Sequence, residues 1–122
     1  MIGYVTLGTN DKDRAARFYD ALLAELGAKR AMELDKFILW AGPSGGPMVA
    51  IAIPFDGERA TVGNGVMVAL LASSREQVDA LYRKALELGG TDEGPPGPRS
   101  PTFYAGYFRD LDGNKLNAFY MG

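Results

Sequence analysis

Histidine and cysteine are both absent from this 122-residue sequence. Without them the chain has neither imidazole nor thiolate, the usual protein ligands of zinc, iron and nickel. A Ser-His or Cys-His nucleophile pair is excluded for the same reason, and so is a disulfide. We therefore expect no transition-metal site, no triad-type nucleophile and no cofactor.

The sequence also lacks an excess of charge of one sign. Thirteen basic and fifteen acidic residues give a net charge of −2, without any run of Lys or Arg. No nucleic-acid or membrane partner is expected. No apolar run approaches the roughly 20 residues that span a bilayer, and residues 1–7 lack the basic flank of a signal peptide. The absence of cysteine fits the cytoplasmic location that we predict.

Two segments have apolar residues at helical spacing, Asn10 to Leu26 and Ser73 to Leu88. Asn10 is the predicted N-cap of the first helix, and residues 73–76 form a capping-box pattern at the start of the second. Glycines follow both segments, as is typical of helix ends. We predict two amphipathic helices that each cover a sheet.

Runs of β-branched and aromatic residues predict eight strands. They cover residues 3–7, 28–33, 37–41, 48–53, 66–71, 91–93, 103–109 and 115–120. Turn-forming residues at 42–47 and 110–114 predict two hairpin connections. The segment 94–101 is rich in proline and glycine, and we expect a loop over the sheet there.

The chain repeats itself at a shift of 63 residues, which aligns Tyr4 with Met67 and Phe18 with Leu81. We predict an α+β fold in one domain, residues 1–122, built of two β-α-β-β-β modules at about 1–54 and 65–122. One module alone would leave a sheet face bare. The modules are expected to form a curved mixed sheet around a central groove, with the helices on the convex face.

Strand alternation indicates which residues face the groove. Val5, Leu7, Val66, Val68, Leu116 and Ala118 are suited to face the helices. The residues between them then face the groove and are candidates for ligand binding. Further aromatic and basic residues, outside this alternation, are also candidates for ligand binding. The predicted ligand-binding residues are Tyr4, Thr6, Trp40, Met67, Arg99, Tyr104, Asn117 and Phe119, with Ala69 and Tyr107 beside them. This lining suits a flat or partly apolar organic molecule.

Three stretches, at residues 4–11, 16–19 and 109–116, occur in an order that resembles the vicinal oxygen chelate superfamily. Glyoxalase I, bleomycin resistance proteins and extradiol dioxygenases belong to that superfamily. The resemblance implies metal-ligand positions at Tyr4, Met67 and Asn117. Phenol, thioether and amide oxygen are poor replacements for imidazole and carboxylate, so no metal site is expected.

Several candidate residues have more than one interpretation. Tyr4 is the single catalytic candidate, as a proton donor, or it fills the volume of a lost metal. Asn117 contacts a ligand or links to another groove residue. Trp40 caps the edge of the core or stacks on a bound ring. Met67 is favoured as filler and Arg99 as a solvated side chain.

We predict a metal-free protein that binds a small organic molecule, by analogy with the bleomycin resistance proteins, and that forms a homodimer. One alternative is a lyase or isomerase of the glyoxalase type that uses Tyr4 without a metal. Another is a non-catalytic protein-interaction module whose groove is collapsed. Enzyme activity is the less favoured interpretation.

Overall fold

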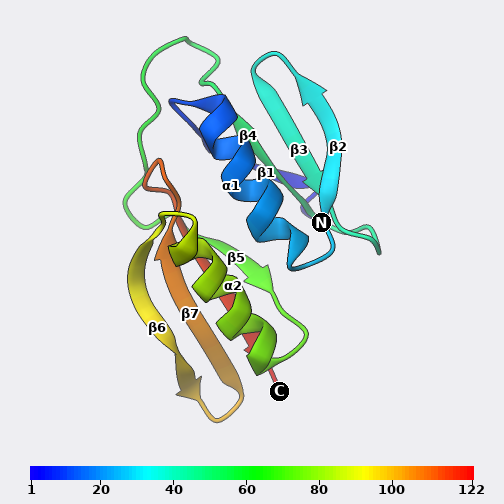
Figure 1. Ribbon diagram of the computed structural model, residues 1–122, viewed down its shortest axis with the longest axis vertical. Coiled ribbons are helices and arrows are strands. Elements are labelled where there is room, and N and C mark those ends of the chain that lie inside the picture. Colours follow the sequence, from blue (N-terminus) through cyan, green and yellow to red (C-terminus); the bar gives the residue numbers. More distant parts are fainter. The chain divides into compact units, whose positions relative to one another are not determined.

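Two compact units make up the chain in the computed structural model, which describes residues 1–122. Unit 1 is Met1–Val62 and unit 2 is Gly63–Gly122. Each contains one helix and one four-stranded sheet (Figure 1). Unit 1 comprises β1 (Tyr4–Gly8), α1 (Lys12–Ala24), β2 (Lys29–Leu34), β3 (Phe37–Ala41) and β4 (Met48–Ala52). Unit 2 comprises β5 (Val68–Leu71), α2 (Arg75–Glu87), β6 (Thr91–Ser100), β7 (Phe103–Arg109) and β8 (Lys115–Met121). Neither helix is long and apolar enough to cross a membrane.

The two sheets have the same topology. The strand orders are β1-β4-β3-β2 and β5-β8-β7-β6. In each, the first strand pairs in parallel with the last, and the other pairs are antiparallel. A parallel pair needs a long crossover, which the helix and two further strands supply. The predicted α+β class and the β-α-β-β-β modules are confirmed, and both bounds of α2 lie 63 residues after those of α1.

Each helix covers one face of its own sheet. α1 contacts β2, β3 and β4, while α2 contacts β6, β7 and β8. Alternate strand residues pack against the helix and are buried. They include Leu7, Ile38 and Ile51 in unit 1 and Leu70, Phe108 and Leu116 in unit 2. Because burying one such side chain stabilises the fold by about 1.5–3 kcal/mol, these contacts hold each helix on its sheet.

The face of each sheet opposite its helix is called the open face below. On β1 the open face carries Tyr4 and Thr6, which are exposed, while Leu7 on the helix side is buried. On β8 it carries Asn117 and Phe119, which pair across the sheet with residues of β5 and β7. In each unit, every second residue of a strand therefore lies on the open face, as the alternation in the sequence predicts.

The helix starts differ in detail from the sequence prediction. Asp11, not Asn10, is the N-cap of α1, and its Oδ1 accepts a hydrogen bond from the backbone N–H of Arg14 at 3.1 Å. Asn10 instead bonds the backbone of Ala60 through both ends of its amide. At α2 the N-cap is Ser74, whose Oγ accepts a hydrogen bond from the backbone N–H of Gln77 at 3.1 Å. The cap therefore lies one residue after Ser73, the position that the pattern at 73–76 indicates.

The proline- and glycine-rich segment is a strand, so the expected loop at 94–101 is wrong. β6 continues to Ser100 and pairs with β7, with register shifts along the way. Proline lacks a backbone N–H and cannot donate to a neighbouring strand. It is tolerated in β6 because this is an edge strand, and because no backbone N–H is required where the pairing is irregular. The structure therefore places Arg99 on a strand.

The start of β5 also differs from the prediction. The strand begins at Val68, and Val66 is 61% exposed where it was expected to face the helix. A turn precedes it, closed by a hydrogen bond from the N–H of Val66 to the carbonyl of Gly63. The turn ends the alternation that the sequence prediction extended back to Val66.

A buried carboxylate organises the turn between β7 and β8. Asp110 is 6% exposed, and its Oδ1 accepts from the backbone N–H groups of Asp112 and Asn114, each at 2.9 Å. The side-chain amide of Asn114 donates to Oδ2 at 2.9 Å, and Gly113 has a φ of +90° that favours glycine. These bonds make Asp110 a turn former.

Asp110→Ala should lower the free energy of unfolding by about 3 kcal/mol, because three donors lose a charged acceptor in a buried setting. Asp56→Ala is the matched control, since Asp56 is exposed and accepts from the N–H of Glu58. We expect the control to cost less than about 1 kcal/mol. Urea unfolding of both variants measures the difference, and equal losses would contradict this role of Asp110.

Candidate functional site

The open face of unit 1 presents an aromatic pair beside a hollow. The ring of Tyr4, 54% exposed, meets that of Phe37 edge-on, with centroids 6.1 Å apart. A hollow of about 600 Å³ begins next to them. Its lining is mostly apolar, with Thr6 and Lys36 as the polar side chains, and consists of Thr6, Gly8, Lys36, Phe37, Ala52, Ile53, Pro54 and Phe55. This volume is typical of a small-molecule site.

The open face of unit 2 centres on one buried amide. Asn117 is 2% exposed and lies between Ala69 of β5 and Tyr107 of β7 in the sheet register. Its Oδ1 has no hydrogen-bond partner. Two residues along β8, Phe119 stacks on Phe103 with centroids 5.6 Å apart. The face thus combines aromatic surface with one unused acceptor.

Two cations lie against Tyr107 on the same sheet. The guanidinium of Arg99 lies 5.3 Å from the ring centroid and the ammonium of Lys115 lies 5.7 Å from it. Arg99 also donates to the carbonyls of Pro95 and Gly97, so it braces the proline-rich strand. Arg99 is therefore exposed, as expected of a solvated side chain, but held in place by these contacts.

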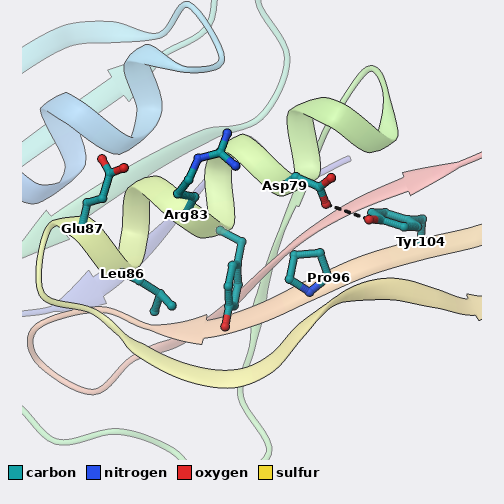
Figure 2. A pocket seen from close by; sticks show the side chains of 7 residues that line it. Asp79, Arg83, Leu86, Glu87, Pro96 and Tyr104 are labelled. Atoms are coloured by element: carbon teal, nitrogen blue, oxygen red, sulfur yellow. Dashed lines mark hydrogen bonds between the residues drawn. The ribbon is translucent and has the colours of Figure 1, made fainter.

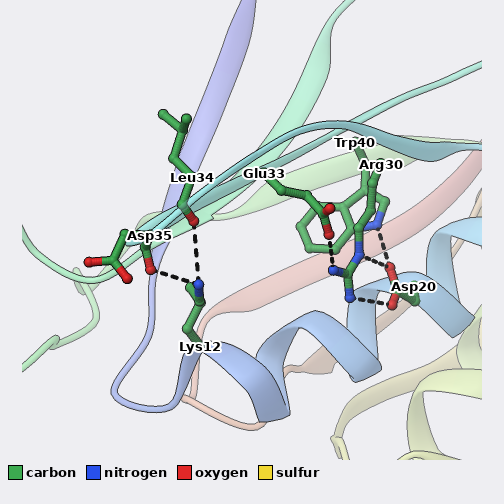
Figure 3. Close-up of polar contacts among 7 residues, drawn as sticks. All are labelled: Lys12, Asp20, Arg30, Glu33, Leu34, Asp35 and Trp40. Atoms are coloured by element: carbon green, nitrogen blue, oxygen red, sulfur yellow. Dashed lines mark hydrogen bonds and ion pairs between the residues drawn. The ribbon is translucent and has the colours of Figure 1, made fainter.

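Trp40 lies on the helix side of its sheet. It is 1% exposed, and its indole N–H donates to Oδ1 of Asp20 on α1 at 3.0 Å (Figure 3). Arg30 bonds both oxygens of the same carboxylate and also pairs with Glu33. This position supports the interpretation that Trp40 caps the edge of the core. Trp40 does not lie on the open face, so it is not placed to stack on a ring bound there.

Tyr104 also lies on the helix side. Its hydroxyl donates to Oδ1 of Asp79 on α2 at 2.7 Å, at one end of a second hollow of about 690 Å³ (Figure 2). Charged side chains of α2, including Arg83 and Glu87, line that hollow. Tyr104 is therefore separated by the sheet from Asn117 and Phe119.

The displaced pKa values belong to groups that hold the helices in place. The hydrogen bond from Arg30 lowers the pKa of Asp20. The bond to Asp79 raises the pKa of Tyr104, and burial together with the bond to Asp92 raises the pKa of Tyr82. All three groups have a hydrogen-bond partner within the protein, so a structural role accounts for the shifts in their pKa values.

The residues at the metal-ligand positions do not fit a transition metal. Tyr4 offers a phenol, Met67 a thioether just before β5, and Asn117 an amide. No group of three or more His, Cys, Asp or Glu in residues 1–122 could hold a metal ion. Thioether, neutral phenol and amide oxygen bind borderline divalent ions weakly. These three side chains therefore do not fit a transition-metal site.

Sequence reasoning missed several residues of the open faces, namely Lys36, Phe37, Phe55, Phe103 and Lys115. For Lys115 a signal was available, because alternation along β8 puts it on the same face as Asn117 and Phe119. For Phe37 there was none, because both faces of β3 are apolar. Phe55 lies beyond β4 in irregular chain, where periodicity gives no signal.

Two repeated β-α-β-β-β units with mixed sheets define the class of protein. The family model of the Glyoxalase/Bleomycin resistance protein/Dioxygenase superfamily matches residues 1–118, and the chain belongs to this superfamily. No protein of curated function matches the sequence.

Solved structures agree with this assignment. A glyoxalase/bleomycin resistance protein from Albidiferax ferrireducens T118 is 36% identical, with a TM-score of 0.92 over 100% of this chain and 99% of that one. A hypothetical protein from S. aureus is 27% identical, with a TM-score of 0.76 over 98% and 92%. A lactoylglutathione lyase from Agrobacterium tumefaciens shares the fold, at 22% identity and a TM-score of 0.71 over 98% and 92%.

Asp20→Asn should destabilise unit 1 by about 1 kcal/mol at neutral pH, because the ion pair with Arg30 is lost while an acceptor for Trp40 remains. The folded pKa of Asp20 lies below its ordinary 3.8, so the ion pair stabilises fully above that pH and its contribution disappears as pH falls through the lowered value. The difference between wild type and variant should therefore shrink in acid.

Unfolding in urea at neutral pH and well below pH 3.8 measures this difference. Glu58→Gln, a change at an exposed carboxylate, is the control and should leave stability unchanged at both pH values. A variant as unstable in acid as at neutral pH would show that the ion pair is not the cause.

Proposed function

We propose that the chain is a metal-free binding protein for a small organic molecule, which it holds on the open face of unit 1. The hollow beside Thr6 and Phe37 is the observation that carries this proposal. Its volume of about 600 Å³ and mainly apolar lining suit burial of an apolar or aromatic ligand, with Thr6 and Lys36 available to orient it.

Phe55 gives further support because its side chain is fully exposed at the rim of the hollow, with a relative exposure of 108%. A large apolar side chain gains nothing for folding from this position, whereas a bound ring would remove it from water. The proposal assigns Phe55 to ligand contact.

Binding without catalysis is favoured by the setting of Tyr4. General acid-base catalysis needs a group that exchanges a proton with its neighbours. Tyr4 meets the apolar ring of Phe37 edge-on, which suits contact with a flat ligand. The chain also lacks the histidine and cysteine that most often share a proton with a nucleophile.

Phe55→Ala should weaken binding about tenfold without changing the melting temperature of the free protein, because the side chain is exposed in the absence of ligand. Val62→Ala is the control, since Val62 is an exposed apolar residue of the same unit outside the hollow. Its affinity should equal that of wild type.

A panel of small aromatic and carboxylate-bearing compounds, screened by thermal shift and followed by calorimetric titration, supplies the ligands for this comparison. The absence of stabilisation by any compound would argue against the proposed function. Equal affinities of the Phe55 and Val62 variants would show that the ligand does not bind in the hollow.

A further inference from the structure

Small residues form the floor of the hollow in unit 1. Gly8, Ala52 and Phe37 pair with one another across β1, β4 and β3, so they form one row on the sheet. Gly8 has no side chain and Ala52 has only a methyl group, while the ring of Phe37 lies at the end of the row. All three residues line the hollow. The row therefore leaves space over β1 and β4, with an aromatic ring at its side.

The chain that follows β4 is held at both ends. The N–H of Ile53 donates to the carbonyl of Lys36 at 2.9 Å. Further on, the backbone N–H of Ala60 donates to the side-chain amide of Asn10 at 2.7 Å, and the same amide donates to the carbonyl of Ala60 at 3.1 Å. Phe55 lies between these two attachments. It is therefore held beside the hollow without a ligand, which lowers the entropy lost on binding.

Lys36 brings the only charge to this hollow. The residue is exposed, and its ammonium makes no hydrogen bond or ion pair within the protein. The lining contains no carboxylate, and Thr6 is its one other polar side chain. A charge beside apolar surface is screened less than a charge in open water. The hollow therefore favours an anionic group on its ligand and disfavours a cationic one.

The hollow of unit 2 provides a contrast within the same chain. Its lining carries both signs of charge, from Asp79, Arg83 and Glu87 (Figure 2). The carboxylate of Asp79 accepts from the hydroxyl of Tyr104, and that of Glu87 pairs with Lys84 at 3.4 Å. That lining favours neither sign of charge, so the single unpaired cation distinguishes the hollow of unit 1.

We propose that the hollow of unit 1 binds an aromatic carboxylic acid in its ionised form. The ring packs over the small residues of the floor, in contact with Phe37 and Phe55, and the carboxylate pairs with Lys36. The flexible stem of a lysine lets its ammonium meet a carboxylate at the margin of the hollow, where the acid keeps part of its hydration. This inference rests on the proposed function and adds the chemical class of the ligand.

Three probes with the same ring system and different charge test the proposal. 2-Naphthoate is an anion, 2-naphthalenemethanol is neutral and 2-naphthylmethylamine is a cation. Calorimetric titration of wild type should give an affinity for 2-naphthoate about fivefold higher than for the alcohol, and the amine should bind most weakly. Added salt should reduce the preference for the acid. Equal affinity for the acid and the alcohol would overturn the proposal.

Lys36→Gln should lower the affinity for 2-naphthoate about fivefold and leave that for the alcohol unchanged, because only the charge is lost. Its melting temperature without ligand should equal that of wild type, since Lys36 is exposed and unpaired. Lys36→Arg should keep the preference for the acid. Lys29→Gln, the loss of an exposed lysine of the same unit outside the hollow, is the matched control and should change no affinity. A full preference for the acid in Lys36→Gln would contradict the proposal.

The outcomes distinguish this inference from the proposed function. If the alcohol or the amine binds as tightly as 2-naphthoate and Phe55→Ala weakens that binding, the charge of the ligand is wrong and the proposed function stands. If no organic compound stabilises the protein, the proposed function fails and this inference fails with it.

Discussion

The alternation of side chains along a strand is the constraint on which the rest of the structure depends. One helix per unit covers one face of its sheet, so every second strand residue enters the core and the others lie on the open face. Leu7, Ile51 and Leu116 are buried for this reason, while Thr6 is exposed. Fold and candidate site are thus set by the same period.

This arrangement separates the architecture from the chemistry of the open faces. Solved structures that are 36% and 27% identical to this chain have the same fold. The positions that the resemblance implies for metal ligands hold Tyr4, Met67 and Asn117, whose phenol, thioether and amide groups bind borderline divalent ions weakly. The shared fold therefore does not determine the chemistry at these positions, in keeping with the general rule that function lies in sites placed on a fold.

Much of the fold could be predicted from the sequence because the helices are amphipathic and the repeat is regular. The phase of two strands could not. β3 reads Phe-Ile-Leu-Trp-Ala, with no polar residue to indicate which side faces the helix. In β7 both alternations carry aromatic residues, and the only charged residue, Arg109, lies at the end of the strand. Trp40 and Tyr104 were candidates for the site for that reason. The edge strand β6 was missed because proline opposes strand pairing except at edges and bulges, and a sequence does not reveal an edge.

The melting temperature of chelator-treated protein, measured with added Zn²⁺, Ni²⁺, Fe²⁺ or Mn²⁺ and then with organic compounds in the presence of chelator, tests metal-free binding most directly. We predict no response to any of the metals and a stabilisation by an organic ligand that chelator does not affect. A rise in melting temperature with one of the metals that disappears in Asn117→Ala would contradict the account.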